Sequence, residues 1–244
     1  MASFVRMNRT NVSTAEGTSS LSDIFTKSVS LLNTPDPIYG SGIDGDATIS
    51  TNTSLTSDMQ YANLTINSSI VLNPNGYRIF VRDTLTMHSG SRIGYTAGFS
   101  TAGSIAQGGA TNTSVTHSLG GSSATQTATA PAAVLGGTNY YYYAMQAVRG
   151  WAVSASSTTP TFLRGGAGGT GGPGGGVVIL AARYIAASVS TSFISATTSG
   201  TSSGGGGGVV IVISSGNVMQ PGITIDVTGA SGASNGTSIY LQVG

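Results

Sequence analysis

Two carboxylates open the most regular part of the sequence. Asp44 and Asp46 stand two positions apart in "GIDGDAT". Paired carboxylates can act as general acid and base, and carboxylate oxygens can bind Ca²⁺. One short acidic segment supplies too few oxygen ligands for a calcium cage, whereas Asp and Gly both favour turns. We therefore expect a turn that opens the first strand, rather than a catalytic or metal site.

Two histidines, His88 and His117, raise the possibility of a hydrolase or a metal centre. The sequence has no G-x-S-x-G segment to present a nucleophilic serine, and no acidic third ligand stands at a suitable spacing. A polysaccharide depolymerase built on stacked strands would need converging carboxylates, but only Asp83 and Asp226 follow residue 58. We expect no catalytic residue, no metal and no cofactor.

An aromatic cluster is the strongest candidate for a contact site. Tyr140, Tyr141, Tyr142 and Tyr143 are consecutive, and Trp151 follows them. Side chains on a strand alternate between its two faces, so four consecutive tyrosines cannot all enter one core. Tyr and Trp are favoured at interfaces because they combine a large apolar area with a polar group. We expect these residues to contact a partner subunit or a neighbouring protein, with stacking on the sugar rings of a ligand as the alternative.

The composition excludes several classes of function. Of 244 residues only 7% are charged, the net charge is +1, and the nine basic residues form no stripe that could follow a nucleic acid backbone. No apolar run approaches the roughly 20 residues of a membrane span, and the N-terminus lacks the apolar region of a secretory signal. The absence of cysteine excludes disulfides. Low charge reduces solubility, so it favours a protein whose surface is covered in an assembly.

Glycine makes up 37 of the residues and concentrates in two runs that precede apolar segments. The first, "GGAGGTGGPGGG" over 165–176, has a period of three and precedes "VVIL". The second, "GGGGG" over 204–208, precedes "VVIVI". Three residues per turn is the repeat of the polyproline-II helix, whose backbone groups have no internal hydrogen bonds and must bond to neighbours. We expect ordered, polyglycine-II-like segments; a flexible linker is the alternative, and collagen would need far more proline.

This interpretation assigns a side to each position of the first run. The third residue of each triplet should point outward and the glycines should form bare edges against neighbouring backbones. The outward residues are Ala167, Thr170 and Pro173. The structural glycines predicted on bare edges are Gly168, Gly169, Gly171 and Gly172, with Gly206 and Gly207 in the second run.

From Ala47 onward, short segments of strand-forming residues alternate with turn residues, which predicts an all-β fold. Val177 and Val178 recur as Val209 and Val210, 32 positions later, and "ISATTSG" aligns with "IDVTGASG" after a slip of one residue. A repeat of this size favours a stack of coils, of the parallel β-helix kind. A β-sandwich is the alternative.

The same features divide the chain into four parts. Residues 1–40 form an N-terminal attachment segment with a short amphipathic helix in 19–33, and 41–93 form a β module. Residues 94–160 are a Ser/Thr/Tyr-rich insertion or lateral loop, and 161–244 are a glycine-rich β repeat module.

The segment from Asp44 to Met87 resembles a module of tailed-phage and other viral structural proteins. That module begins D-G-D-x-T-I, continues as "NLTI" and L-N-x-N-G-Y-R-I-F-V, and is commonly followed by glycine runs ending in "GGGGVVII". This chain has all three parts, the last as "GGGGVVIVI", so the resemblance extends from about Gly42 to Ile213. It implies a right-handed β-helical or glycine-rich layered fold that is exposed on a virion.

The resemblance also implies a function. We expect a non-enzymatic structural protein on the virion surface, made in the host cytoplasm, either a capsid decoration or head fibre or a tail-fibre component. Its partners would be its own copies, in a homotrimer, and capsid or tail proteins. The alternative is a receptor-binding adhesin that recognises a host surface glycan or outer-membrane protein through the aromatic cluster.

Overall fold

The structure is a computed structural model that describes residues 38–94, 111–129, 140–149, 163–187, 191–198, 204–216 and 222–243, and two strands near the N-terminus. The chain forms two compact units, Met1–Pro37 and Ile38–Gly244. In the first unit β1 (Val12–Thr14) pairs antiparallel with β2 (Gly17–Ser19). The helix predicted over 19–33 lies outside the described residues, apart from Ser19 at the end of β2.

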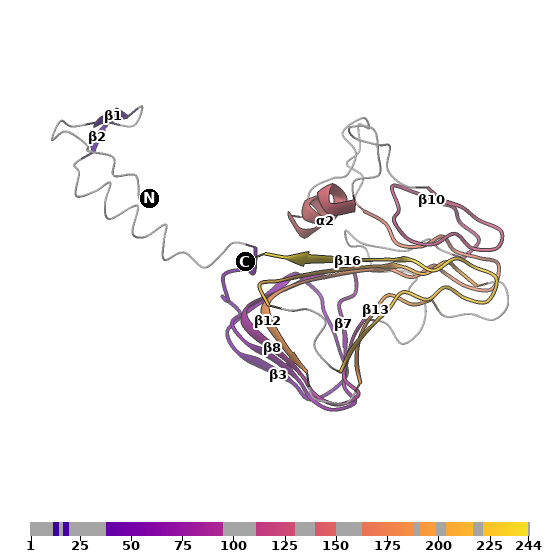
Figure 1. Cartoon of the computed structure of the whole chain (residues 1–244), viewed down its shortest axis with the longest axis horizontal. Coiled ribbons are helices and arrows are strands. Elements are labelled where there is room, and N and C mark those ends of the chain that lie inside the picture. The colour runs from indigo at the N-terminus through magenta and orange to yellow at the C-terminus, as the bar shows by residue number, and fades with distance from the viewer. Residues whose placement is uncertain are drawn as a thin grey trace. The chain divides into compact units, whose positions relative to one another are not determined.

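The second unit is built on two parallel sheets between which the chain alternates. The larger sheet has the order β16 (Thr237–Gln242), β14 (Val209–Ser214), β12 (Val177–Ala187), β8 (Arg78–Met87), β6 (Leu64–Ile66) and β3 (Ala47–Ile49), with β5 (Met59–Tyr61) also paired to β8. The smaller sheet has the order β15 (Ile223–Asp226), β13 (Ser192–Ser195), β9 (Arg92–Gly94), β7 (Val71–Asn73) and β4 (Thr53–Ser54). Figure 1 shows β3, β8 and β12 along one side of the core and β7 and β13 along the other.

These sheets confirm the all-β prediction. Every described strand pair within them is parallel, which differs from the antiparallel pairing of the usual β-sandwich that was the alternative expectation. The sequence repeat also predicts the pairing of β12 with β14, in which Val177 lies opposite Val209 and Val178 opposite Val210. The one-residue slip is confirmed as well, because Ile194 lies opposite Ile225.

The apolar runs at 177–182 and 209–213 do not alternate with polar residues because both faces of their strands are buried. Val178 and Leu180 face the core between the two sheets. Val177 and Ile179 face outward into a second apolar cluster, which includes residues of the helix α2 (Tyr140–Arg149). A strand covered on both faces has no position that favours a polar side chain.

The tyrosine run begins the helix α2, which lies within the predicted insertion of residues 94–160 and was not predicted from the sequence. Ala147 and Val148 are buried in the outer cluster, and Arg78 donates a hydrogen bond to the carbonyl of Val148 at 2.8 Å. The second half of the segment, "AMQAVR", contains strong helix formers that the run of tyrosines obscures. Elsewhere in this part of the chain β10 (Val115–Thr116) pairs in parallel with β11 (Ala128–Thr129).

Candidate functional site

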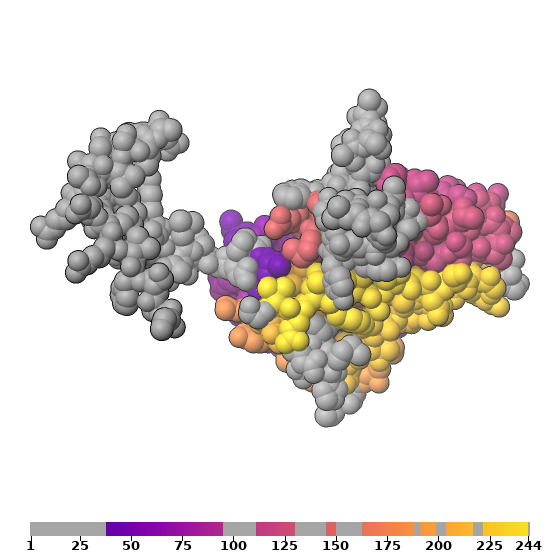
Figure 2. Space-filling model, turned by 45° about the horizontal axis from the view of Figure 1, so that its top comes forward, coloured from indigo at the N-terminus to yellow at the C-terminus, as the bar shows by residue number. Residues whose placement is uncertain are grey.

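The glycine-rich segments gather beside the sheets in a bundle of extended chains that are neither helices nor strands (Figure 1). We call this the glycine bundle. Its segments are 118–123, 163–169, 172–176, 196–198, 204–208, 227–230 and 234–236. Figure 2 shows residues 111–129, in pink, packed directly against the yellow C-terminal residues. A hydrogen bond of 2.8 Å from the backbone N–H of Ser234 to the carbonyl of Ser122 joins these two parts.

The central segment, 204–208, shows what conformation the bundle uses. Gly206 donates its backbone N–H to Ala167 at 2.8 Å, Gly207 to Ser234 at 3.0 Å, and Gly208 to Ala196 at 2.7 Å. Three consecutive N–H groups therefore reach three different segments. In a β-strand they would alternate between two sides, whereas a helix with three residues per turn directs them three ways. The second glycine run is ordered, and its consecutive N–H groups bond in three directions.

The carbonyl groups of the same segment accept hydrogen bonds from further parts of the chain. Gly206 accepts a hydrogen bond from Gly175 at 2.9 Å, and Gly207 accepts one from Gly121 at 2.7 Å. Gly205 accepts one from Ala230 at 3.1 Å. Counting donors and acceptors, the segment bonds to parts of the chain at 121, 167, 175, 196, 230, 234 and 237. It is enclosed by backbone on all sides, and all five of its residues are buried.

Glycine is required here because neighbouring backbones occupy the space that a side chain would fill. A Cβ on Gly206 would lie 1.9 Å from the carbonyl oxygen of Gly121, and one on Gly207 would lie 1.9 Å from that of Val227. Real Cβ atoms essentially never approach another atom within 3.0 Å. The two structural glycines predicted in the second run therefore lie at points of direct contact between backbones.

The first glycine run differs from its prediction, because it does not continue as one three-fold helix. Gly169 and Gly172 exchange backbone hydrogen bonds, of 2.9 and 3.4 Å, around a turn at Thr170 and Gly171. The chain reverses there, so the run forms two legs of the bundle instead of one. Both turn residues are exposed.

The reversal changes which positions face outward. Ala167 has no exposed surface, so the prediction that it points outward is wrong. Its N–H bonds to Gly121 and its carbonyl to Gly206, and these neighbours enclose it. Thr170 is exposed, as expected, and Pro173 is half-buried. Of the four glycines predicted on bare edges, Gly168, Gly169 and Gly172 are buried, whereas Gly171 is exposed in the turn.

Short turns in or beside the legs lie together at the end of the bundle that is farther from the two large sheets (Figure 1). The turn at 124–125 approaches the turn at 231–232, where a Cβ on Gly232 would lie 4.0 Å from that of Ala124. Asn112 bonds to the carbonyl of Gly169 at 2.9 Å, beside the turn at 170–171. The residues of these turns are small or polar, and they are exposed.

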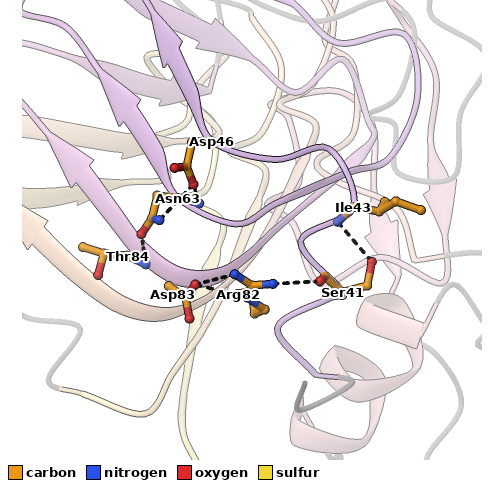
Figure 3. Close-up of polar contacts among 7 residues, drawn as sticks. All are labelled: Ser41, Ile43, Asp46, Asn63, Arg82, Asp83 and Thr84. Atoms are coloured by element: carbon orange, nitrogen blue, oxygen red, sulfur yellow. Dashed lines mark hydrogen bonds and ion pairs between the residues drawn. The ribbon is translucent and has the colours of Figure 1, made fainter. Parts of the chain in front are cut away.

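The carboxylates of Asp44 and Asp46 accept hydrogen bonds from backbone N–H groups at a corner of the stacked strands. Figure 3 shows Asp46 and its partner Asn63. The Asp46 carboxylate accepts hydrogen bonds from the backbone N–H and the side-chain amide of Asn63, at 3.1 and 2.9 Å. Asn63 in turn accepts one from the N–H of Thr84 at 3.2 Å. Asp44 accepts one from the N–H of Gln60 at 2.6 Å. The expected turn is present, and each side chain bonds to the next turn of chain in the stack.

A second pair of charges lies at the same corner. Arg82 and Asp83 form an ion pair of 2.8 Å, and Arg82 also donates to the carbonyl of Ser41 at 3.4 Å (Figure 3). His88 follows β8 and is exposed, whereas His117 follows β10 at a left-handed φ of 57°. Among the described residues no group of three or more acidic or histidine side chains could hold a metal ion.

The aromatic contact site remains a prediction. Tyr140, Tyr141, Tyr142 and Tyr143 form the first part of α2, but their side chains lie outside the described part of the structure, as does Trp151. None of the described helices is long and apolar enough to span a membrane.

Sequence reasoning also missed two parts of the bundle, 118–123 and the stretch 227–236, which includes the turn at 231–232. The first contains only one glycine pair, Gly120 and Gly121. The second reads "GASGAS" over 229–234, and this period of three was the signal that could have identified it.

Comparisons with known proteins give no relative. No protein-family model matches the sequence, and neither the curated proteins nor the solved structures include a significant match.

Proposed function

We propose that this chain is a non-enzymatic structural protein of a virion exterior, either a capsid decoration or a tail-fibre component. The observation that carries the proposal is the enclosure of residues 204–208 by backbone in every direction. Such a bundle holds exposed turns at a distance from the stacked strands, and its shape depends on backbone contacts rather than on a few side chains. This is the property that a part exposed on a particle needs.

The resemblance to viral surface modules adds support from a different part of the chain. The acidic and amide residues of that module, among them Asp44, Asp46 and Asn63, are the ones that bond from one turn of chain to the next. We further propose that the two parallel sheets form a right-handed β-helix. The alternation of the chain between the sheets supports this coiling, and the resemblance supports its handedness.

A homotrimer is part of the same proposal. With 7% charged residues, the chain has little charge repulsion to keep its copies apart. Contact with capsid or tail proteins would then cover further surface, and residues 1–40 would provide the attachment.

One observation favours a second candidate, a receptor-binding adhesin. The exposed turns at 124–125, 170–171 and 231–232 lie together at one end of the bundle, and ligand-binding residues are often found on loops held by a rigid scaffold. Such an adhesin would recognise a host surface glycan or outer-membrane protein.

A binding experiment separates the two candidates. Purified protein is mixed either with particles of the virus that encodes the sequence, from which its gene has been deleted, or with host cells. A structural component should sediment with the particles and not with the cells, and an adhesin should bind susceptible cells without particles. Failure to bind either one would contradict both proposals.

A further inference from the structure

The two halves of the larger sheet have different outer surfaces. The half formed by the first parts of β8 and β12, with β14 and β16, is covered by α2, Tyr39 and Leu163. The other half is formed by β3, β6, residues 84–87 of β8 and residues 184–187 of β12. Among the described residues no apolar cluster covers this second half, and its outward side chains are exposed or half-buried.

A row of threonines crosses this uncovered half. Thr48 lies opposite Thr65, and Thr65 lies opposite Thr86, so the three occupy the same position on adjacent strands, about 4.8 Å apart. Their neighbours along the strands, such as Ile66 and Met87, point into the core. Among the described residues no protein group forms a hydrogen bond with the three threonine hydroxyls.

An exposed aromatic ring stands beside this row. Tyr184 lies opposite Thr84, just after a β-bulge at which Arg82 and Asp83 face the single residue Arg183. Bulges redirect side chains, and 53% of Tyr184 is exposed. The guanidinium carbon of Arg183 lies 6.0 Å from the centre of the ring. We call the surface formed by Thr48, Thr65, Thr84, Thr86 and Tyr184 the threonine face.

The chemistry of the threonine face selects among ligands. None of its five side chains is charged, and the cation beside them, Arg183, lies next to the tyrosine ring and not along the row of threonines. The face therefore has no basic stripe that could follow a nucleic acid or an anionic lipid surface. It has no large aliphatic side chain for an apolar protein partner to cover. It does offer hydroxyl groups at a regular spacing and one aromatic ring with an apolar face and a polar end. A neutral sugar has the complementary groups, namely hydroxyls around its rim and C–H groups on its faces.

We propose that the threonine face binds a neutral polysaccharide that runs across the strands from Tyr184 toward Thr48. The sugar units would stack on the tyrosine ring and exchange hydrogen bonds with the threonine hydroxyls. The proposed site is separate from both the bundle turns and the tyrosines of α2. It does not require the chain to belong to a virion.

Affinity electrophoresis of the full-length protein tests this proposal. The protein is run through native gels containing dextran, mannan or galactan, with dextran sulfate as the charged comparison. We expect retardation by at least one neutral polysaccharide. Tyr184→Ala should weaken the apparent affinity roughly tenfold, as loss of an aromatic anchor does. Thr65→Val, which replaces one hydroxyl by a methyl group, should weaken it about two- to fivefold.

A matched control lies on the other sheet. Thr224 is exposed on β15, and Thr224→Val should leave the retardation unchanged. Thermal melting of each variant verifies that it is folded. The proposal is overturned if none of the three neutral polysaccharides retards the protein, or if Tyr184→Ala and Thr65→Val are retarded as strongly as the wild type. Retardation by dextran sulfate alone would also overturn it.

Discussion

The side-chain hydroxyl of Tyr39 donates a hydrogen bond of 3.1 Å to the carbonyl of Val243, 204 positions later in the chain. Tyr39 is buried in the outer apolar cluster together with Phe80 and Ile239. The start of the second unit is therefore attached to its last residues. Strand pairing alone does not provide this link, because β3 and β16 lie at opposite edges of the larger sheet.

Removal of this hydroxyl should weaken the fold. Tyr39→Phe keeps the ring in the cluster but leaves the carbonyl of Val243 without this donor, so we expect the free energy of unfolding to fall by about 1 kcal/mol. Urea denaturation measures the change. Tyr184→Phe, which removes an exposed hydroxyl, is the control and should have almost no effect. If both variants have the wild-type midpoint, the Tyr39 bond contributes nothing to stability.

The glycine bundle should tolerate substitution at its turns but not at its centre. Gly206→Ala places a methyl group where the backbone of Gly121 lies, and we expect a loss of at least about 1 to 3 kcal/mol, as for other overpacked sites. Thr170→Ala, in the exposed turn, should melt close to the wild type. If residues 204–208 were a flexible linker, Gly206→Ala would leave stability unchanged or raise it slightly, because the substitution restricts the unfolded chain. Equal melting temperatures for the two variants would contradict the ordered bundle.

The hydrogen bonds that join Asp46, Asn63 and Thr84 at the corner should contribute measurably to stability. Asn63→Ala removes the acceptor for the N–H of Thr84 and the amide donor to Asp46, and we expect a loss of about 1 kcal/mol in urea denaturation. Asn67→Ala is the control, because its side chain forms no hydrogen bond with a described residue. If the free energy of unfolding falls equally in the two variants, the hydrogen bonds of Asn63 do not stabilise the fold.

Stability should fall at high pH because of Tyr61. Burial, and secondarily the charge of Asp44, raises the pKa of Tyr61 above its ordinary value of 10.0. The folded state thus holds the phenol proton more tightly than the unfolded state does. This stabilisation is complete below pH 10 and is lost as the pH rises through the pKa of the folded state. Tyr61→Phe should therefore reduce the decline of the urea midpoint above pH 10, and an unchanged decline would contradict this assignment.

The proposed homotrimer can be tested directly by measuring the mass of the purified protein. Sedimentation of the purified chain at micromolar concentration should give about three times its 24.2 kDa. A monomer that persists at this concentration would exclude the homotrimer, without affecting the interpretation of the bundle.

The sequence predicts those parts of the fold that depend on local repetition. The recurrence of Val177 at Val209 predicts a strand pairing, because equivalent residues in a stack of parallel strands lie side by side. It does not predict the turn at Thr170 and Gly171, since a glycine triplet fits equally well before and after a reversal of direction. Nor does it predict α2, whose position depends on the burial of Ala147 and Val148 against a sheet that is distant in sequence.

The candidate sites also combine features that follow from local sequence with features that depend on distant parts of the chain. A turn at Asp44 and Asp46 follows from their local sequence, but their acceptor role depends on residues 16 and 17 positions away, Gln60 and Asn63. The threonine face is harder still to recognise. Thr48, Thr65 and Thr86 are ordinary residues at uneven intervals, and only the register of the strands brings them into one row.

The enclosure of residues 204–208 also has a consequence for the order of folding. Strands β3 to β9 derive from one continuous stretch, 47–94, so they can pair while the rest of the chain is still being synthesised. The central glycine segment cannot do so, because it needs residues near 121 and residues near 234 at the same time. Such long sequence separations slow folding, since the loops between them must close first. The bundle should therefore form after the stacked strands β3 to β9, once the residues near 234 have left the ribosome.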